Sequence, residues 1–153
     1  MSPNNPEFKG YGFLNEEHVL RFIQDPGNRI EFIRIIFPDI LGRQMDFTIP
    51  KEELEKAFSE GKGFDGSSVE GLVRIEESDL VIRPEASTFR VLPWEYKGFD
   101  PEISWREAVM FGDILTPEGK PYEGDSRYIL KKTLEKARKE HGLEDFKVGP
   151  ELE

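Results

Sequence analysis

The sequence predicts an α+β fold, and three features of its apolar pattern lead to that prediction. Ile30–Phe37 is mostly apolar, and residues 44–49 alternate strictly between polar and apolar side chains, which together indicate a β-hairpin. Residues 51–60 carry apolar side chains at helical spacing, and three short apolar segments follow further along the chain. A hairpin, a helix and then more strands is the order of an α+β domain rather than of alternating strands and helices.

A short helix is expected before the hairpin. Asn15 is a typical N-cap, and Val19, Leu20 and Ile23 recur at helical spacing until the chain reaches a turn near Asp25.

The second helix has its own boundary signals. Pro50 suits the first helical position, Gly61 suits the end, and the apolar face carries Leu54, Ala57 and Phe58. Further strands are expected at Leu80–Arg83, Thr88–Leu92 and Ala108–Ile114. This order of elements resembles a β-grasp sheet.

The composition divides the chain into a loose tail at 1–14, a β-grasp domain at 15–115, a linker at 116–124 and a second unit at 125–153. In that unit Asp125 can cap a helix that ends near Gly142, and a strand candidate begins at Phe146. One helix and the start of one strand cannot close a core. The unit either packs back onto the first domain or begins a longer domain that is cut short, and we expect the second.

The charge and the residue usage exclude several classes of function. The chain has 31 acidic and 21 basic residues and a formal net charge of −10, which opposes binding to nucleic acid. It has no cysteine, so disulfides and zinc sites with cysteine ligands are excluded. No apolar run is long enough to span a membrane, and we expect a cytoplasmic protein without a membrane partner.

The segment FDGSSVEG at residues 64–71 is the strongest candidate for chemistry. A phosphate-binding loop would need lysine where Ser67 stands, and a nucleophile elbow would need glycine where Glu70 stands. The two histidines, His18 and His141, lie far apart in the sequence and indicate neither a triad nor a metal-binding pair.

From the residues alone, Asp65–Ser68 is an ordinary turn, because Asp and Ser bond their own backbone and Gly permits a positive φ. Asp79 is then simply the first residue of a strand. A second interpretation comes from a resemblance. Phe64–Ser68, followed after eight residues by ESDLVI at Glu77–Ile82, resembles the N-terminal signature of glutamine synthetase.

The resemblance continues outside the signature. Similar segments are FIRIIFPDILG at 32–42, RPEASTFRVLPW at 83–94, GDSRYILKK at 124–132 and GPELE at 149–153. It covers about residue 15 to the end and looks closest to the bacterial and archaeal class I enzymes. It implies a β-grasp domain followed by the beginning of the catalytic domain, with one helix and one strand.

In this family the β-grasp domain packs against the catalytic domain of the neighbouring subunit in a homo-oligomeric ring, a dodecamer, and its Asp-Gly-Ser-Ser loop completes that neighbour's active site. The resemblance therefore implies that Asp65 binds ammonium and accepts its proton, with Ser67 and Ser68 as supporting substrate-binding residues. A carboxylate favours a cation, and a desolvated carboxylate can accept a proton. Asp79 is expected to order the loop.

Glu151 and Glu153 are candidate metal ligands. Two residues apart in a strand, they would point to the same face. Taken alone they are a solvated acidic end. In the family the matching glutamates each bind one of two divalent ions, which implies Mg²⁺ or Mn²⁺ beside the co-substrate ATP.

The implied activity is ATP-dependent ligation of ammonia to L-glutamate through γ-glutamyl phosphate. Glutamine synthetase chains are much longer, so we expect the enzyme to be a ligase when intact and this chain alone to be inactive. Two alternatives remain open. One is a non-catalytic β-grasp module that regulates a full-length synthetase, and the other is a related ligase that joins another amine to glutamate.

Arg34 is a further candidate, because it lies in the middle of an apolar segment. Such an arginine usually pairs with a nearby acid or reaches solvent. The sharper hypothesis is an anion-binding contact at a subunit interface, where it would bind a regulatory carboxylate metabolite as effector.

Overall fold

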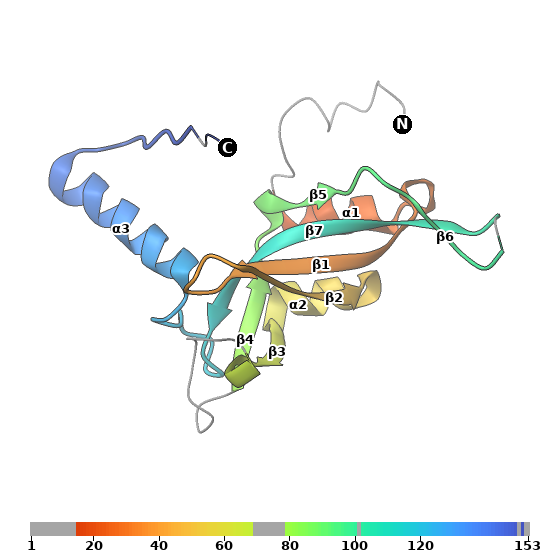
Figure 1. Cartoon of the computed structure of the whole chain (residues 1–153), viewed down its shortest axis with the longest axis horizontal. Coiled ribbons are helices and arrows are strands. Elements are labelled where there is room, and N and C mark those ends of the chain that lie inside the picture. Colours follow the sequence, from red (N-terminus) through yellow and green to blue (C-terminus); the bar gives the residue numbers. More distant parts are fainter. Residues whose placement is uncertain (1–14, 69–78, 101, 150, 152–153) are drawn as a thin grey trace.

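The computed structural model describes residues 15–68, 79–100, 102–149 and 151. Its centre is a mixed sheet in the strand order β2-β1-β7-β4-β3, with the short strands β5 and β6 also pairing with β7 (Figure 1). The strands are β1 (Ile30–Pro38), β2 (Gln44–Pro50), β3 (Lys62–Asp65), β4 (Asp79–Pro84), β5 (Arg90–Val91), β6 (Tyr96–Lys97) and β7 (Ser104–Leu115). The α-helices are α1 (Glu16–Gln24), α2 (Leu54–Glu60) and α3 (Ser126–His141). The α+β prediction is confirmed.

The predicted hairpin of β1 and β2 turns around a buried carboxylate. Asp39 accepts hydrogen bonds at Oδ1 from the backbone N–H groups of Leu41 and Arg43, both at 2.8 Å. Its Oδ2 accepts a third from Nε of Arg43 at 2.7 Å. Gly42 closes the turn with φ +77°, a conformation that glycine adopts without steric cost.

The core lies between one face of the sheet and the helices α1 and α2. β1 runs parallel to β7, with Ile33 beside Ala108 and Ile35 beside Met110, and all four side chains are buried. The helices add Val19, Ile23, Leu54, Ala57 and Phe58 to the same cluster. The alternating residues of β1, such as Phe32 and Arg34, belong to the opposite sheet face.

The turn from α2 into β3 depends on Gly61. Its backbone has φ +77° and ψ 176°, a region that is essentially restricted to glycine. A Cβ atom there would lie 2.2 Å from Cγ1 of Val81, so a side chain would also collide with β4. After this turn the chain forms β3, which the sequence did not predict, and Phe64 packs against Phe37 and Phe47 with ring centroids 5.4 and 6.2 Å apart.

Two boundaries expected from the sequence were wrong. Pro50 is the last residue of β2, and the helix that follows starts as a 3-10 turn at Lys51–Glu53 before α2. The strand expected at Thr88–Leu92 is reduced to β5. Thr88 instead ends the 3-10 turn Ala86–Thr88. Its hydroxyl donates to the carbonyl oxygen of Glu85 at 2.6 Å and accepts from the N–H of Phe111 in β7 at 2.9 Å, so the side chain takes part in local bonds of the turn.

The prediction of a strand from Phe146 was also wrong for the residues that the structure describes. Residues 146–149 and 151 have no regular secondary structure and pair with none of the strands above. The side chains of Phe146 and Val148 are 56% and 87% exposed. A strand forms only where a neighbouring strand accepts its backbone hydrogen bonds, and no such neighbour lies beside these described residues.

The segment between β7 and α3 folds back as a turn. The N–H of Thr116 donates to the carbonyl oxygen of Lys120 at 2.7 Å, and the N–H of Tyr122 donates to that of Ile114 at 3.0 Å. Asp125 then caps α3 as predicted, accepting from the N–H groups of Arg127 and Tyr128. From this cap α3 extends away from the sheet (Figure 1).

Candidate active site

Asp65 is the last residue of β3 and lies directly opposite Asp79, the first residue of β4. The preceding pair, Phe64 and Leu80, faces the core, so the two aspartates share the other face of this strand pair. Both aspartates are exposed. The sheet therefore positions two carboxylates at the base of the loop that joins the strands.

Ser67 holds the carboxylate of Asp65 in place. Its backbone N–H donates to Oδ1 of Asp65 at 2.9 Å, and its hydroxyl donates to the same oxygen at 2.6 Å. These two bonds lower the pKa of Asp65. The bond from the hydroxyl has the larger effect and the bond from the N–H the smaller one, while slight burial acts in the opposite direction. The carboxylate is therefore charged at neutral pH.

This geometry suits a cation better than it suits proton transfer. Facing residues of an antiparallel pair have Cβ atoms about 5 Å apart, so the charges of Asp65 and Asp79 repel each other unless a cation offsets them. A carboxylate with a lowered pKa is a weak base. It would become a better one only if another surface covered the loop and excluded water.

Several predicted residues lie outside the described part of the chain. Ser68 belongs to the 3-10 turn Gly66–Ser68, but its side chain is not described, and Glu77 and Glu153 are not described either. Glu151 is exposed and lies in irregular chain. Among the described residues no three His, Cys, Asp or Glu side chains lie close enough to hold a metal ion. Because Glu153 lies outside the described residues, the metal-ligand roles of Glu151 and Glu153 stay predictions.

Arg34 lies on the sheet face opposite the core and pairs with Glu107 of β7, a buried carboxylate that the sequence analysis missed. The hydroxyl of Tyr96 also donates to Glu107, at 3.0 Å from Oε2. The sequence did not single out Glu107, because it follows the charged Arg106 and precedes the strand expected at Ala108–Ile114. The ordinary interpretation of Arg34, pairing with a nearby acid, describes what the structure shows.

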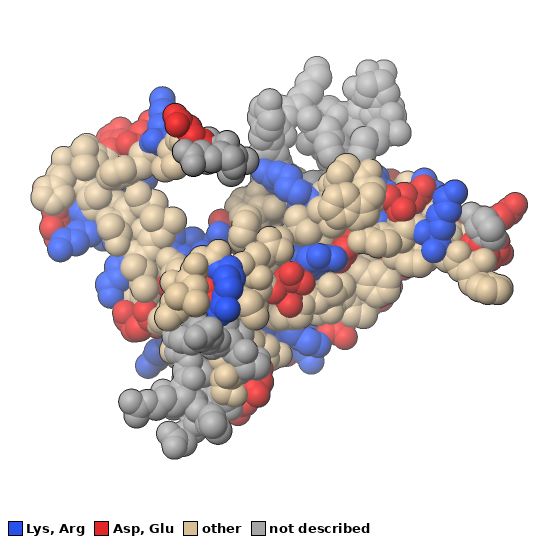
Figure 2. Space-filling view, in the orientation of Figure 1, with Lys and Arg blue, Asp and Glu red and all other residues tan. Residues whose placement is uncertain are grey.

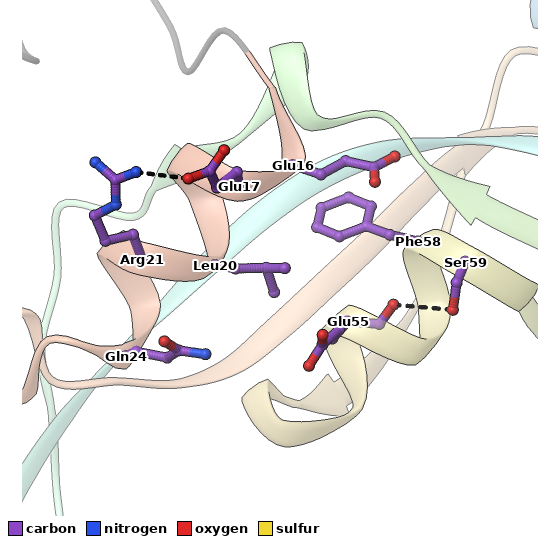
Figure 3. Close-up of a pocket in the computed structure, with 8 residues that line it drawn as sticks. All are labelled: Glu16, Glu17, Leu20, Arg21, Gln24, Glu55, Phe58 and Ser59. Atoms are coloured by element: carbon purple, nitrogen blue, oxygen red, sulfur yellow. Dashed lines mark hydrogen bonds and ion pairs between the residues drawn. The ribbon is translucent and has the colours of Figure 1, made fainter.

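A hollow of about 520 Å³ lies between α1 and α2 (Figure 3). Leu20 and Phe58 supply its apolar part, and Glu16, Glu17 and Glu55 lie around it. It contains none of the predicted site residues. Glu16 and Glu17 lie in the first turn of α1, where acidic side chains favour the helix dipole, so a structural role accounts for them.

Charges of both signs are interspersed over the face shown in Figure 2, without a large patch of one sign. That surface lacks the clustered Lys and Arg of a nucleic-acid-binding face. Among the described residues, no helix has both the length and the apolar composition that a membrane span needs.

The sheet order, the parallel pairing of β1 with β7 and the covering helices define a β-grasp domain, here with an acidic loop at one end. The family described as "Glutamine synthetase, beta-Grasp domain" matches residues 29–117. The chain belongs to the glutamine synthetase family, and the resemblance in the sequence is confirmed.

Named relatives agree with this assignment. Glutamine synthetase of Methanosarcina mazei is 42% identical over 138 residues, which cover 90% of this chain and 29% of that protein. The Thermus thermophilus glutamine synthetase is 41% identical over 127 residues, or 83% of this chain and 28% of the relative. The chain thus spans under one third of the length of these relatives.

Solved structures show the same fold. The cryo-EM structure of Plasmodium falciparum glutamine synthetase superposes with a TM-score of 0.72 at 26% identity, over 84% of this chain and 23% of that one. The ligand-free structure of GmaS gives a TM-score of 0.64 at 23% identity over 83% of this chain and 27% of that one, which supports the fold alone.

Proposed function

We propose that the protein carrying this sequence is an ATP-dependent ligase that joins ammonia to L-glutamate through γ-glutamyl phosphate. The observation that carries the proposal is the ordered, charged carboxylate of Asp65 at the end of β3, in a β-grasp domain of the glutamine synthetase family. Membership of the family indicates the reaction, and the carboxylate of Asp65 is a group that could take part in it.

Asp65 attracts ammonium in this proposal. Two bonds from Ser67 to one carboxylate oxygen keep the group charged and fix its direction, so little reorganisation is needed when a cation arrives. Asp79 adds negative charge from the facing strand and holds the base of the loop. After the loop is covered and water is excluded, Asp65 takes a proton from ammonium and releases ammonia as the nucleophile.

The covering surface is a neighbouring subunit in a homo-oligomeric ring. Supporting this, the sheet face opposite the core exposes large apolar side chains of two adjacent strands, Phe32 at 40% and Phe111 at 42%. Apolar area of this kind is buried when subunits associate. The loop of one subunit would then contribute to the active site of the next.

ATP and divalent metal ions belong to the same proposal, with Mg²⁺ or Mn²⁺ expected from oxygen ligands. Glu151 and Glu153 would supply two ligands at most, and the described residues form no metal site. No chemical step is therefore assigned to a metal held by this chain. Most residues of the ATP site and of the metal site would lie in the part of the longer relatives that this sequence does not match.

The decisive experiment measures ATP-dependent glutamine formation by the full-length protein with Asp65→Asn. The substitution removes the charge but keeps the size, and we expect kcat to fall by at least about 100-fold. Glu60→Gln is the matched control, since Glu60 is an exposed carboxylate of α2 in a different part of the domain. Equal activity of the Asp65→Asn and Glu60→Gln proteins would refute the role of Asp65.

The same assay separates the alternatives. Replacing ammonium by methylamine distinguishes a glutamate–ammonia ligase from a ligase for another amine. We expect the 153-residue chain alone to form no glutamine. If it instead enters a full-length synthetase ring and changes its activity, as measured by native mass and rate together, the regulatory module is the better description.

A further inference from the structure

We propose that four charged side chains form a clasp that joins the N-terminal part of α3 to the β-grasp sheet, and that this clasp sets the direction in which the helix leaves the domain. The clasp consists of Glu85, Asp113, Arg127 and Lys131. The inference concerns the folded chain itself and does not rest on the proposed activity.

Apolar packing does not attach α3. None of its residues is buried, and its apolar side chains Ile129, Leu130 and Leu134 are 50%, 58% and 37% exposed. A helix on a domain surface is normally held by burying one apolar face. The attachment of α3 must therefore come from polar contacts.

Each cation of the clasp contacts both carboxylates. Arg127 pairs with Asp113, Nε to Oδ1 at 3.0 Å, and with Glu85. Lys131, one turn later, places Nζ at 2.6 Å from Oδ2 of Asp113 and at 3.0 Å from Oε2 of Glu85. The guanidinium of Arg127 also lies over the ring of Phe111, 5.3 Å from its centroid. Because every side chain is used twice, fixing it yields two interactions for one loss of side-chain entropy.

A second set of bonds fixes only the first turn of the helix. The buried carboxylate of Asp125 accepts from the N–H of Ile114 in β7 at 3.2 Å, and the hydroxyl of Ser126 donates to the carbonyl oxygen of Pro38 at 3.2 Å. These bonds act at a single point, so they form a pivot and do not restrain the tilt of the helix. Lys131, more than one turn from the pivot, restrains that tilt.

The side chains of the clasp are partly exposed to solvent, so we expect the clasp to weaken with salt. The exposed fractions of its side chains run from 19% for Arg127 to 49% for Lys131. Screening shortens the reach of such charges from about 8 Å at physiological ionic strength to about 3 Å at 1 M salt. Apolar contacts do not weaken in this way, so ionic strength distinguishes the two modes of attachment.

The test measures the distance between α2 and α3 in the full chain by pulsed electron paramagnetic resonance. Because the chain has no cysteine, Ser59→Cys and Lys139→Cys introduce the only two labelling sites, both at exposed positions. We expect a narrow distance distribution at low salt and roughly a doubling of its width at about 1 M KCl. A distribution that stays narrow at high salt would overturn the proposal.

Two neighbouring lysines of α3 provide a matched comparison at low salt. Lys131→Gln removes a cation of the clasp, whereas Lys132→Gln removes a lysine that pairs only with the exposed Glu123 at 3.3 Å among the described ion pairs. We expect Lys131→Gln to broaden the distribution as high salt does and Lys132→Gln to leave it narrow. Equal widths for the two variants would contradict the clasp. The salt series on the labelled parent chain decides the question even if a variant folds poorly.

Discussion

Arg34 and Glu107 form a bidentate ion pair across the parallel strands β1 and β7. Nε of Arg34 lies 2.9 Å from Oε1 of Glu107, and Nη2 lies 2.9 Å from Oε2. The carboxylate is 6% exposed and the guanidinium 34%, so the pair lies under the open face of the sheet with the arginine reaching outward. This pairing accounts for a charge in the middle of an apolar strand. The effector-binding role of Arg34 stays a prediction.

Removing one partner of this pair should destabilise the domain. Glu107→Ala leaves a partly buried guanidinium without its carboxylate, and we expect the free energy of unfolding to fall by about 2–3 kcal/mol. The double variant Arg34→Met with Glu107→Leu replaces both charges by apolar groups and should lie within about 1 kcal/mol of the parent. Urea unfolding measures both. A double variant as unstable as Glu107→Ala would contradict this explanation.

Gly61→Ala should be far more destabilising than an alanine at another glycine with positive φ. Gly119 also has φ +77°, but a Cβ there would meet nothing within 4 Å. We expect Gly119→Ala to cost about 1 kcal/mol from backbone strain alone. Gly61→Ala adds the collision with Val81 and should cost about 3 kcal/mol or more. Urea unfolding measures both variants. Equal midpoints for Gly61→Ala and Gly119→Ala would show that the turn from α2 to β3 rearranges to accept a side chain.

Ser67→Ala should raise the pKa of Asp65. The Ser67 hydroxyl is the largest cause of the lowered value, and the backbone N–H would remain. We expect the pKa to move back toward the ordinary value of 3.8. An NMR titration of the Asp65 carboxyl carbon measures it, with Ser59→Ala as control because the Ser59 hydroxyl donates only to backbone carbonyl oxygens among its described bonds. An unchanged pKa after Ser67→Ala would mean that the hydroxyl does not hold the carboxylate in solution.

Acid should release α3 from the sheet. Burial raises the pKa values of Glu85 and Asp113. Hydrogen bonds from Lys131 and Ser87 to Glu85, hydrogen bonds from Lys131 and Arg127 to Asp113, and the charges of both cations outweigh burial and leave both pKa values lowered. A carboxylate with a lowered folded pKa stabilises the folded state above its unfolded pKa, 4.5 for Glu and 3.8 for Asp, and that contribution is lost as pH falls through the folded value.

Asp125 opposes this effect, because burial raises its pKa and its protonation therefore favours the folded state. If the clasp carboxylates dominate, the distribution of distances between the α2 and α3 labels broadens as the pH falls below their ordinary pKa values of 4.5 and 3.8, while circular dichroism shows that the sheet stays folded. A distance that changes only together with global unfolding would contradict a separate release of the helix.

Much of this protein was determined by its sequence alone. Local signals act over a few residues, so Asn15, Gly61 and Asp125 marked the helix boundaries correctly, and the alternation at 44–49 gave the hairpin. The motif around Asp65 indicated the family because several residues had to match at fixed spacing, and the comparisons confirmed it.

Only the tertiary structure decided which distant residues meet. The pairing of Arg34 with Glu107, the facing aspartates at 65 and 79, and the clasp on α3 each join residues from separate elements. Their contacts depend on strand order and register, which the local pattern does not specify. For the same reason residues 146–149, which have the composition of a strand, do not form one. A strand is completed by hydrogen bonds from its neighbour, and that neighbour is a property of the fold rather than of the segment.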